Sequence, residues 1–288
     1  MDICVYLFDV SSVFSRVYKV LKKNGKDKEP NAFYKGKPIY AIQPTINRIE
    51  KEIRMVRGLV PQYTHIAMVF DYPDICFRHE IYPGYKANRP PKEQDEEVQK
   101  ALLFKALQTQ GYLCFTKIGV ETDDSIGTIS RKLSNKNILN IIFSGDKDFH
   151  QLIDKNTLQF SGRNETLFDA SAVKMKFGVE PEKMLDYLTI IGDKADGITG
   201  VPGAGAKSAV QMLANNKLED FIENPSLLDK LPIKNKNKIR QYFEQNSEQI
   251  KLTKNVVALY DDMDLNINLS MMVKKDPVDT DYLDLIVN

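Results

Sequence analysis

Nine acidic side chains in this sequence have the types and positions expected of metal ligands. Several follow apolar runs, CVYLFD, HIAMVFD, ILNIIFSGDKD and, less regularly, YLTIIGD, which are typical of buried parallel strands. A carboxylate at the carboxyl end of such a strand points into the crevice where open α/β sheets bind ligands. Because carboxylates gathered in one crevice repel each other unless cations neutralise them, the sequence predicts a site for two hard divalent ions, Mg²⁺ or Mn²⁺. The nine residues are Asp9, Asp71, Glu121, Asp123, Asp124, Asp146, Asp148, Asp193 and Asp196.

The local spacing of these acids supports one shared site. GVETDD places three acids on one turn of an expected helix, and SGDKD places two on the same side of an extended segment. GDKAD places two acids on neighbouring positions of a helical turn. The alternative interpretation is a set of solvated helix caps and loop acids, which is the ordinary role of any single one. That alternative does not explain why several of them end strand-like runs.

The segment GVPGAGAKSA, residues 200–209, is the second motif. Its small residues and proline predict a tight hairpin between two helices, with backbone N–H groups facing outward at a helix N-terminus, where phosphates bind. The pattern is that of helix-hairpin-helix modules, which grip a DNA backbone without reading bases. It is not a Walker loop, because the glycine spacing differs and no strand leads into it. An ordinary glycine-rich turn between helices is the alternative. The expected phosphate contacts are Gly203, Gly205, Lys207 and Ser208.

The third motif, FRHEIYPGYKANRPP over residues 77–91, interleaves cations with aromatic rings. Such a mixture suits single-stranded nucleic acid, because phosphates meet positive charge and bases stack on aromatic faces. Arg78 and Tyr85 are the DNA contacts expected in this segment. A solvated basic loop is the alternative, which its position directly after Asp71 disfavours.

The elements that must position these motifs predict an α/β fold. A soft boundary falls near Ser171, beyond which the chain is predicted to be helical. Prolines and glycines argue against a long regular element over 72–92, and the lysine-rich stretch 22–38 is expected to be a loop or hairpin. The predicted strands are 3–9, 65–70, 112–115, 139–143 and 157–160, and the predicted helices are one beginning at Ser11 or Ser12 and those over 42–60, 93–110 and 121–133.

Composition narrows the class of protein further. The 288 residues are 42% hydrophobic, enough for a sizeable core, and the net charge of +1 means that any basic patch is local. Three cysteines without CxxC spacing indicate a reducing compartment and no zinc site. No run reaches transmembrane length and none resembles a signal peptide, so we expect no membrane association. The three histidines, His65, His79 and His150, do not form a metal set, and no pairing suitable for covalent catalysis is evident.

Taken together, the motifs resemble those of the 5′-nuclease superfamily, and most closely the N-terminal 5′-nuclease domain of bacterial DNA polymerase I. The matching stretches are FDVSSVFSR, VFDYPDICFRHEIYPGYKANRPP, GVETDDSIGTI, IIFSGDKDFHQLI and GDKADGITGVPGAGAKSA, in family order across most of residues 3–215. The resemblance implies a mostly parallel central sheet flanked by helices (a PIN-like 5′-nuclease fold), a helical arch and a helix-hairpin-helix. On this basis we expect an α/β nuclease domain over 1–170 with the arch at about 76–110. A helical DNA-binding region is expected over 171–288, with the hairpin module at about 184–215.

The resemblance also implies an activity and roles for single residues. The family hydrolyses phosphodiester bonds of DNA near the junction of a 5′ single strand and a duplex, with divalent metal ions. In this chain Asp9, Asp71, Glu121 and Asp123 would hold one ion, and Asp123, Asp146, Asp148 and Asp193 the other. Asp124 and Asp196 would act through water, Lys86 and Arg89 would contact the scissile phosphate, and Tyr85 would stack on a terminal base. The hairpin module of the family also binds a monovalent ion, commonly K⁺.

Departures from the family pattern leave every carboxylate in place. Val10 stands where a glycine often follows the first aspartate, and Gly197 stands where asparagine is usual. Two other functions stay open: a DNA-junction binder without catalysis, and a PIN-like metal-dependent ribonuclease. We expect a monomer that acts on DNA and on RNA–DNA strands during replication and repair. The expected compartment is a bacterial or phage-infected cytoplasm, or a DNA-containing organelle of an AT-rich eukaryote.

Overall fold

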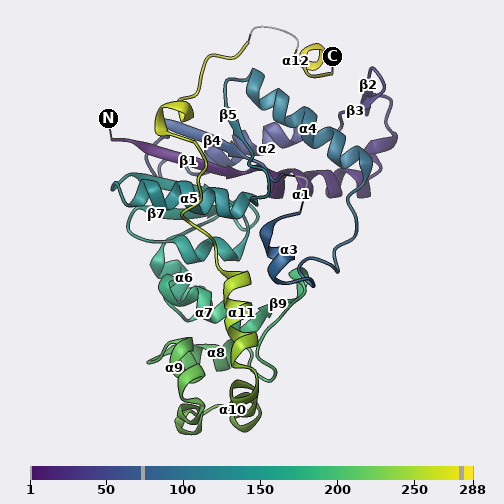
Figure 1. The fold of residues 1–288 in the computed structure, drawn as a ribbon. Coiled ribbons are helices and arrows are strands. Elements are labelled where there is room, and N and C mark those ends of the chain that lie inside the picture. Colours follow the sequence, from purple (N-terminus) through teal and green to yellow (C-terminus); the bar gives the residue numbers. More distant parts are fainter. Residues whose placement is uncertain (1, 73–74, 279–281, 288) are drawn as a thin grey trace.

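A six-stranded sheet forms the centre of the upper part of the molecule (Figure 1). The computed structural model describes residues 2–72, 75–278 and 282–287. The strand order is β5-β4-β1-β6-β7-β8, and every pair is parallel except the antiparallel pair β7–β8, so the expected mostly parallel sheet is confirmed. The strands are β1 (Cys4–Asp9), β4 (His65–Val69), β5 (Leu113–Phe115), β6 (Leu139–Phe143), β7 (Thr157–Ser161) and β8 (Thr166–Phe168).

The apolar run CVYLFD forms a strand because both faces of the sheet are covered. Tyr6 and Phe8 point into one hydrophobic cluster, and Val5 and Leu7 point into the other. A strand buried on both sides is continuously hydrophobic rather than alternating, as the sequence here is. Helices α1 (Val10–Lys23), α2 (Ile42–Met55) and α4 (Gln94–Thr109) cover the first face, and α5 (Thr122–Ser134) covers the second.

The segment predicted as an arch divides into two parts. Its first part contains the short helix α3 (Phe77–Ile81) and an irregular loop that continues to residue 93. Its second part is α4, whose Leu103, Ala106 and Leu107 are fully buried against the sheet. Only the first part is therefore outside the core of the sheet domain, and its Cys76 and Tyr85 are buried in the core of the helical region. The lysine-rich stretch forms the expected hairpin, with strands β2 (Phe33–Tyr34) and β3 (Lys37–Pro38).

One predicted strand is wrong. The run YLTIIGD lies in helix α7 (Met184–Ile191), and Asp193 belongs to a two-residue strand, β9 (Gly192–Asp193), which pairs antiparallel with β10 (Ile198–Thr199). A short, wholly apolar run is compatible with either a buried strand or a buried helix. Here α7 packs between α8 (Ala206–Leu213) and α11 (Ser247–Val257), and its buried side chains belong to a helical core.

The lower part of the molecule is helical, as expected (Figure 1). Its own hydrophobic core includes Met184, Met212, Phe221 and Phe243. Helices α6 (Ala170–Phe177), α9 (Leu218–Glu223) and α10 (Lys236–Gln245) also lie in this region.

The last α-helix of the chain is α12 (Tyr282–Val287). Short 3₁₀ turns occur along the whole chain: η1 (Lys26–Lys28), η2 (Lys147–Leu152), η3 (Pro181–Lys183), η4 (Lys194–Asp196), η5 (Pro225–Lys230) and η6 (Leu269–Met272).

The C-terminal segment does not belong to that helical region. After α11 the chain returns along the α/β domain to α12, which lies beside α4 (Figure 1). Leu265 and Met272 are buried in the core beneath α5, and Ile286 is buried beside α4. The prediction that 171–288 forms one helical region therefore extends too far, because these apolar side chains complete the sheet domain. Among the described residues, no helix combines the length and apolar character needed to cross a membrane.

Candidate active site

The first two acids lie on adjacent parallel strands. Asp9 ends β1, and its carboxylate accepts hydrogen bonds from the backbone N–H of Ser12 (3.0 Å) and from Ser144 Oγ (2.8 Å). Asp9, rather than Ser11 or Ser12, is therefore the N-cap of α1. Asp71 follows β4, and its backbone N–H donates to Ser11 Oγ (2.8 Å). The parallel register of β1 and β4 sets both acids at one end of the sheet.

The start of α5 is tied to the same end. Glu121 is its N-cap residue, and the N–H of Thr122 donates to a carboxylate oxygen of Asp71 (3.1 Å). Acids in the first turn of a helix are stabilised by its positive end. This contact brings Asp123 to the carboxyl ends of β1 and β4.

The third strand end supplies another pair of acids. Asp146 follows β6, and its carboxylate accepts the N–H of Asp148 (3.0 Å) at the start of η2. Buried Gln159 on β7 donates to the backbone carbonyls of Ser144 (3.0 Å) and Asp146 (2.6 Å). Ser144 and Gln159 thus hold the loop that carries the acids. Neither was predicted, because serine and glutamine at these positions give no sequence signal of such a role.

Burial and the charges of neighbouring acids raise the pKa values of several of these carboxyl groups. Burial, and then the charges of Asp71 and Asp146, raise the pKa of Asp9 to about 7. Burial, and then the charge of Asp146, raise the pKa of Asp148 to about 8. Burial and the charges of Asp146 and Asp9 also raise the pKa of Asp123. Raised carboxylate pKa values are the effect of burial and of neighbouring negative charge, so these acids lie near enough to influence each other.

Three basic side chains compensate other acids of the same group. Lys86 forms an ion pair with Glu121, Arg89 with Asp196, and Lys147 with Asp193 (2.8 Å). Burial opposes ionisation of Glu121, but the charges on Lys86 and Arg78 outweigh it and lower the pKa of that carboxyl. Lys147 lowers the pKa of Asp193 in the same way. Lys147 was not predicted, although its position inside SGDKD could have suggested it.

The acidic side chains are of the type that binds hard cations, but in the described part of the chain they are not close enough together to coordinate one ion. Crowded carboxylate oxygens are the ligands that Mg²⁺ and Mn²⁺ prefer, and the raised pKa values mark a cluster that lacks counter-charge. Within the part of the chain that the structure describes, no three acidic, histidine or cysteine side chains are close enough to hold one ion. The ion pairs of Glu121, Asp193 and Asp196 hold these side chains toward basic partners.

Two predicted site residues have a different role. Arg78 is only 2% exposed and Asp124 is 0% exposed, and the guanidinium donates to both carboxylate oxygens of Asp124 (2.5 and 2.8 Å). Arg78 also donates to Glu121 (2.8 Å) and to the carbonyls of Val256 (2.9 Å) and Ala258 (2.7 Å). Its donors are used inside the protein, so the predicted DNA contact is wrong for Arg78. In this structure Asp124 balances the buried charge of Arg78, and its predicted water-mediated metal contact stays a prediction.

Tyr85 is also enclosed. Its ring is 5% exposed and meets His79 edge-on at 5.3 Å between centroids, and its hydroxyl donates to Glu121 (3.0 Å). In this arrangement Tyr85 positions Glu121. The predicted stacking on a terminal base does not fit this conformation, because the ring face is covered.

A set of contacts, which we call the clasp, joins loop 82–89 to turn 194–197. The backbone N–H of Lys86 donates to the carbonyl of Asp196 (2.9 Å), and Asn88 Nδ2 donates to the carbonyl of Lys194 (2.7 Å). Gly197 has φ +72°, and a Cβ added there would lie 2.6 Å from the carbonyl oxygen of Gly84. Glycine at this departure from the family pattern thus permits the close approach. The clasp fixes Lys86 and Arg89 relative to the acids near Asp193.

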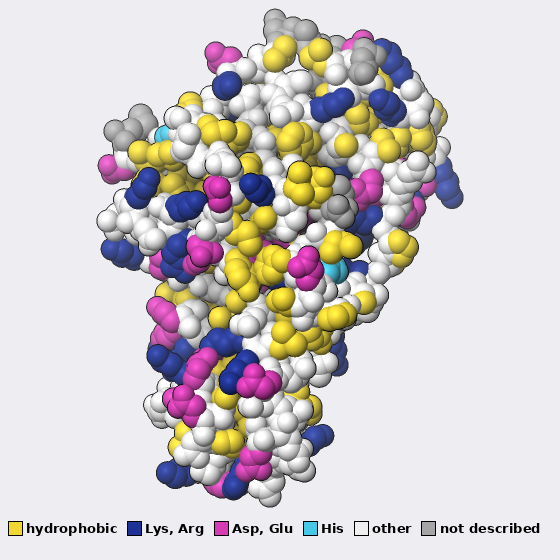
Figure 2. Space-filling view, in the orientation of Figure 1, with side chains coloured by type: hydrophobic (Ala, Val, Ile, Leu, Met, Phe, Trp, Pro, Cys, Tyr) yellow, Lys and Arg dark blue, Asp and Glu magenta, His cyan; other side chains and the backbone are white. Residues whose placement is uncertain are grey.

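The tip of the predicted hairpin module is exposed, whereas its helices are packed in the core of the helical region. It runs from α7 through the β9–β10 turn to α8, and Gly205 is the N-cap residue of α8. Gly203 has φ +92°, and Gly203, Gly205 and Lys207 are exposed while Ser208 is half-buried. On the face drawn in Figure 2, basic and acidic side chains alternate over the helical region, in agreement with the near-zero net charge.

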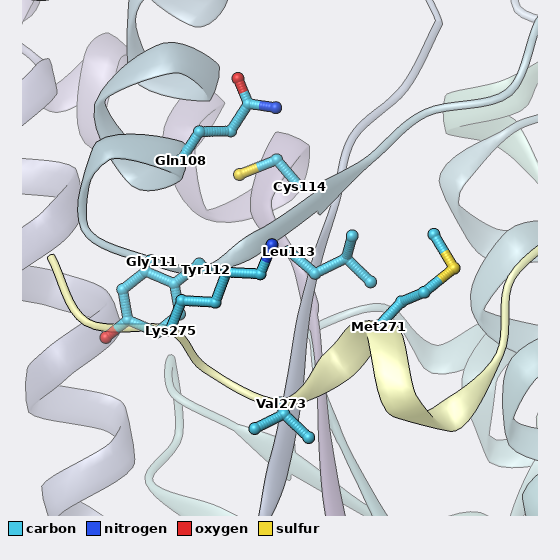
Figure 3. Close-up of a pocket in the computed structure, with 8 residues that line it drawn as sticks. All are labelled: Gln108, Gly111, Tyr112, Leu113, Cys114, Met271, Val273 and Lys275. Carbon is cyan, nitrogen blue, oxygen red and sulfur yellow. The ribbon is translucent and has the colours of Figure 1, made fainter. Parts of the chain in front are cut away.

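Two cavities among the described residues have none of these acids in their linings. A cavity of about 230 Å³ lies elsewhere, between edge strand β5, the end of α4 and the C-terminal segment (Figure 3). None of the eight residues that line it is a predicted site residue. The interacting charged groups at the strand ends therefore lie apart from this cavity.

Comparisons with protein families agree with this geometry. The family described as 5′-3′ exonuclease, N-terminal resolvase-like domain, matches residues 4–178. The family described as 5′-3′ exonuclease, C-terminal SAM fold, matches residues 179–280.

Relatives of this chain include a DNA polymerase I, a 5′-3′ exonuclease and a flap endonuclease. The chain is 32% identical to DNA polymerase I of Pseudomonas aeruginosa over 94% of its length, but spans only 29% of that polymerase. It is 32% identical to the 5′-3′ exonuclease of Aquifex aeolicus, covering 92% of this chain and 84% of that one. It is 31% identical to flap endonuclease Xni of Pseudoalteromonas translucida, covering 73% of this chain and 78% of that one.

Solved structures share the fold at low identity. The T5 D15 protein co-crystallised with metal ions superposes with a TM-score of 0.64 at 20% identity, covering 89% of this chain and 90% of that one. The catalytic core of Rad2 in complex with a DNA substrate gives a TM-score of 0.58 at 16% identity, covering 99% and 86%.

Proposed function

Because this chain belongs to the 5′-3′ exonuclease family, we propose that its acids at the strand ends hydrolyse phosphodiester bonds of DNA where a 5′ single strand meets a duplex. The observation that carries this proposal is the crowding of Asp9, Asp123, Asp146 and Asp148, whose pKa values are raised by burial and by the charges of neighbouring acids. Such a cluster is costly unless cations neutralise it.

The residues that hold divalent ions in this proposal form two overlapping sets. Bound ions would supply Lewis acidity, which lowers the pKa of a water and stabilises charge on the phosphate. Asp196 would act through water, whereas Asp124 belongs with Arg78. Mg²⁺ is the expected ion and Mn²⁺ its substitute, because all ligands are oxygens. One set is Asp9, Asp71, Glu121 and Asp123, and the other is Asp123, Asp146, Asp148 and Asp193.

Lys86 and Arg89 would bind the scissile phosphate. Both are now paired with carboxylates, and the clasp holds them at the edge of the acidic cluster. A phosphate arriving at the cluster offers these two cations an anionic partner, while Glu121 and Asp196 become free to act as ligands. Charge-assisted hydrogen bonds from fixed donors stabilise negative charge that develops on phosphate oxygens during hydrolysis.

The hairpin module would hold the duplex. Gly203 and Gly205 leave room for a phosphate beside the backbone, and exposed Lys207 and half-buried Ser208 add side-chain contacts. Binding through phosphates is blind to sequence and weakens steeply with salt. The family resemblance also predicts a K⁺ ion at this module. Exchanging KCl for a bulky ammonium salt at constant ionic strength should then weaken duplex binding.

The experiment that tests the proposal compares 5′-flap DNA with single-stranded RNA of the same sequence. Wild-type protein with Mg²⁺ should cut the DNA near the junction, and Asp146→Ala and Asp148→Ala should bind it without cutting. Asp169→Ala, at an exposed acid that caps α6, is the matched control and should cut normally. Cleavage of RNA alone would favour the ribonuclease alternative, and binding without any cleavage would favour the junction binder. Undiminished cleavage by both site variants would refute the ligand assignment.

A further inference from the structure

Ser144 lies where three strands of the sheet meet. It directly follows β6, and Phe143, the last residue of β6, pairs in parallel with Phe8 of β1. The next residue of β1 is Asp9, so the serine and this acid lie side by side at the ends of their strands. On its other side, the backbone N–H of Ser144 donates to the carbonyl of Phe160 on β7 (3.2 Å). The serine is 2% exposed and is held by both neighbouring strands.

The hydroxyl of Ser144 makes two hydrogen bonds of opposite sense. It donates to Asp9 Oδ2 (2.8 Å) and accepts the backbone N–H of Asp146 (3.1 Å). A hydroxyl is one of the few side-chain groups that can donate to a carboxylate and accept from a backbone N–H at the same oxygen. One atom therefore connects the carboxylate of Asp9 with the backbone of Asp146.

These hydrogen bonds leave Asp9 able to bind an ion. Its Oδ1 atom accepts the N–H of Ser12 (3.0 Å), and its Oδ2 atom accepts the Ser144 hydroxyl. Each oxygen of an ionised carboxylate has about two acceptor sites, so both oxygens keep one. Partners of this kind orient a carboxylate that binds a metal ion, and removing one typically costs roughly 10- to 100-fold in metal affinity or activity.

The buried side chain of Gln159 holds the same loop from β7. Its Nε2 atom donates to the carbonyl of Ser144 (3.0 Å) and to the carbonyl of Asp146 (2.6 Å), which uses both amide hydrogens. These bonds reach the loop that carries Asp146 and Asp148, whereas the Ser144 hydroxyl also reaches Asp9. Substitutions can therefore separate the effects of the two side chains.

We propose that Ser144 is a positioning residue that couples the two proposed ligand sets, because its hydroxyl holds Asp9 of one set at a constant separation from Asp146 of the other. The inference rests on the proposed function, since it takes these acids to be ligands of divalent ions. Two ions that act on one phosphate must lie at a defined separation of roughly 4 Å. A hydroxyl shared by both sets maintains that separation without itself contacting an ion.

The test measures Mn²⁺ binding by electron paramagnetic resonance without DNA, and Mg²⁺-dependent cleavage of 5′-flap DNA. Ser144→Ala should weaken the binding of both ions, and raise the Mg²⁺ concentration for half-maximal cleavage, by roughly 10- to 100-fold, while the affinity for flap DNA stays near that of wild type. Ser144→Thr keeps the hydroxyl and should recover most of the loss. Gln159→Leu should weaken the binding of one ion. Ser130→Ala is the matched control, because it removes an equally buried hydroxyl whose partners are Asn140 and Thr157 rather than site acids.

Three outcomes would overturn the inference. Ser144→Ala could match wild type in Mn²⁺ binding and in Mg²⁺ dependence. Ser130→Ala could lose as much as Ser144→Ala, with an equal fall in melting temperature in EDTA, which would indicate a structural role. Ser144→Ala and Gln159→Leu could weaken both ions equally, which would show that any disturbance of the loop has the same effect.

A second variant keeps the test decisive if Ser144→Thr folds poorly. Ser144→Cys has a thiol, which is a weak donor and a weak acceptor, so its loss should be smaller than that of Ser144→Ala. An equal loss would refute the role of the hydroxyl. A wild-type protein that does not cut flap DNA would refute the proposed function, whereas the Mn²⁺ titrations would still decide the role of Ser144.

Discussion

Replacing Asp9 by Asn should stabilise the protein when metal is absent. Asp9 is 4% exposed, and burial together with the charges of Asp71 and Asp146 raises its pKa from 3.8 to about 7. Asn retains a side-chain oxygen that can accept from the N–H of Ser12, so the N-cap of α1 is kept. The substitution thus removes the charge and leaves the cap in place.

The size and sign of the effect follow from the pKa. A carboxyl whose pKa is raised by folding favours the folded state below pH 4, and this contribution is lost as pH rises through about 7. The shift of about three pKa units corresponds to at most about 4 kcal/mol of unfolding free energy at pH 8.5. Asp9→Asn should therefore match wild type near pH 4 and exceed it increasingly up to pH 7. Buried His150 has the opposite pH dependence, because burial lowers its pKa to about 4, but it is present in both proteins and cancels in the comparison.

The assay is urea unfolding in EDTA at several pH values. Asp169→Asn is the matched control, because Asp169 also caps a helix but is exposed and has a pKa lowered by hydrogen bonds from the N–H of Ala172 and from Ser171. That variant should be neutral or slightly less stable. Adding Mg²⁺ should stabilise wild type by mass action, about 2.7 kcal/mol at one hundred times Kd, and stabilise Asp9→Asn less. If Asp9→Asn is less stable than wild type at pH 8.5 in EDTA, the idea of crowded charge at this strand end is wrong.

Three further changes test other contacts. Gly197→Ala should force the clasp apart, because φ is +72° and the added Cβ would lie 2.6 Å from the Gly84 carbonyl oxygen. The rate of flap-DNA cleavage, measured by kinetics, should then fall by a larger factor than the affinity for duplex DNA, measured by anisotropy. Equal losses of rate and affinity would contradict this. Arg78→Met should lower the free energy of unfolding by about 3–5 kcal/mol, since the carboxylate of Asp124 is left buried without its partner. If the double variant Arg78→Met, Asp124→Leu regains this stability, the unpaired carboxylate is the cause. Lys207→Glu should weaken duplex binding equally for all sequences. The slope of log K against log salt concentration should become less steep by about one for each lost phosphate contact. A loss of affinity in binding titrations that depends on sequence would count against the hairpin assignment.

The convergence of Asp9, Asp71 and Asp146 could be predicted from sequence. Each follows an apolar run typical of a strand buried on both faces, and parallel strands end at one edge. The same rule failed for Asp193, because an isolated apolar run carries no information about whether a neighbouring strand exists. The β9–β10 turn nevertheless brings Asp193 to Lys147 by another route.

The roles of Arg78 and Asp124 could not be predicted from the motifs that contain them. Both lie among residues that suit DNA or metal binding, and a charged residue in such a motif is normally assigned to the ligand. Their pairing depends on α3 packing against α11 and on the carbonyls of Val256 and Ala258, more than 130 residues further along the chain.

The ion pairs in the site make metal binding and substrate binding interdependent. Glu121, Asp193 and Asp196 are each neutralised by a basic side chain, so an ion that recruits them must displace a lysine or an arginine. In the absence of substrate, the displaced cation would be left without an anionic partner. A DNA phosphate provides that partner for Lys86 and Arg89, and the exchange then conserves the number of charge pairs. Divalent ions should therefore bind more tightly when DNA is present, and by reciprocity the ions should increase the affinity for DNA by the same factor.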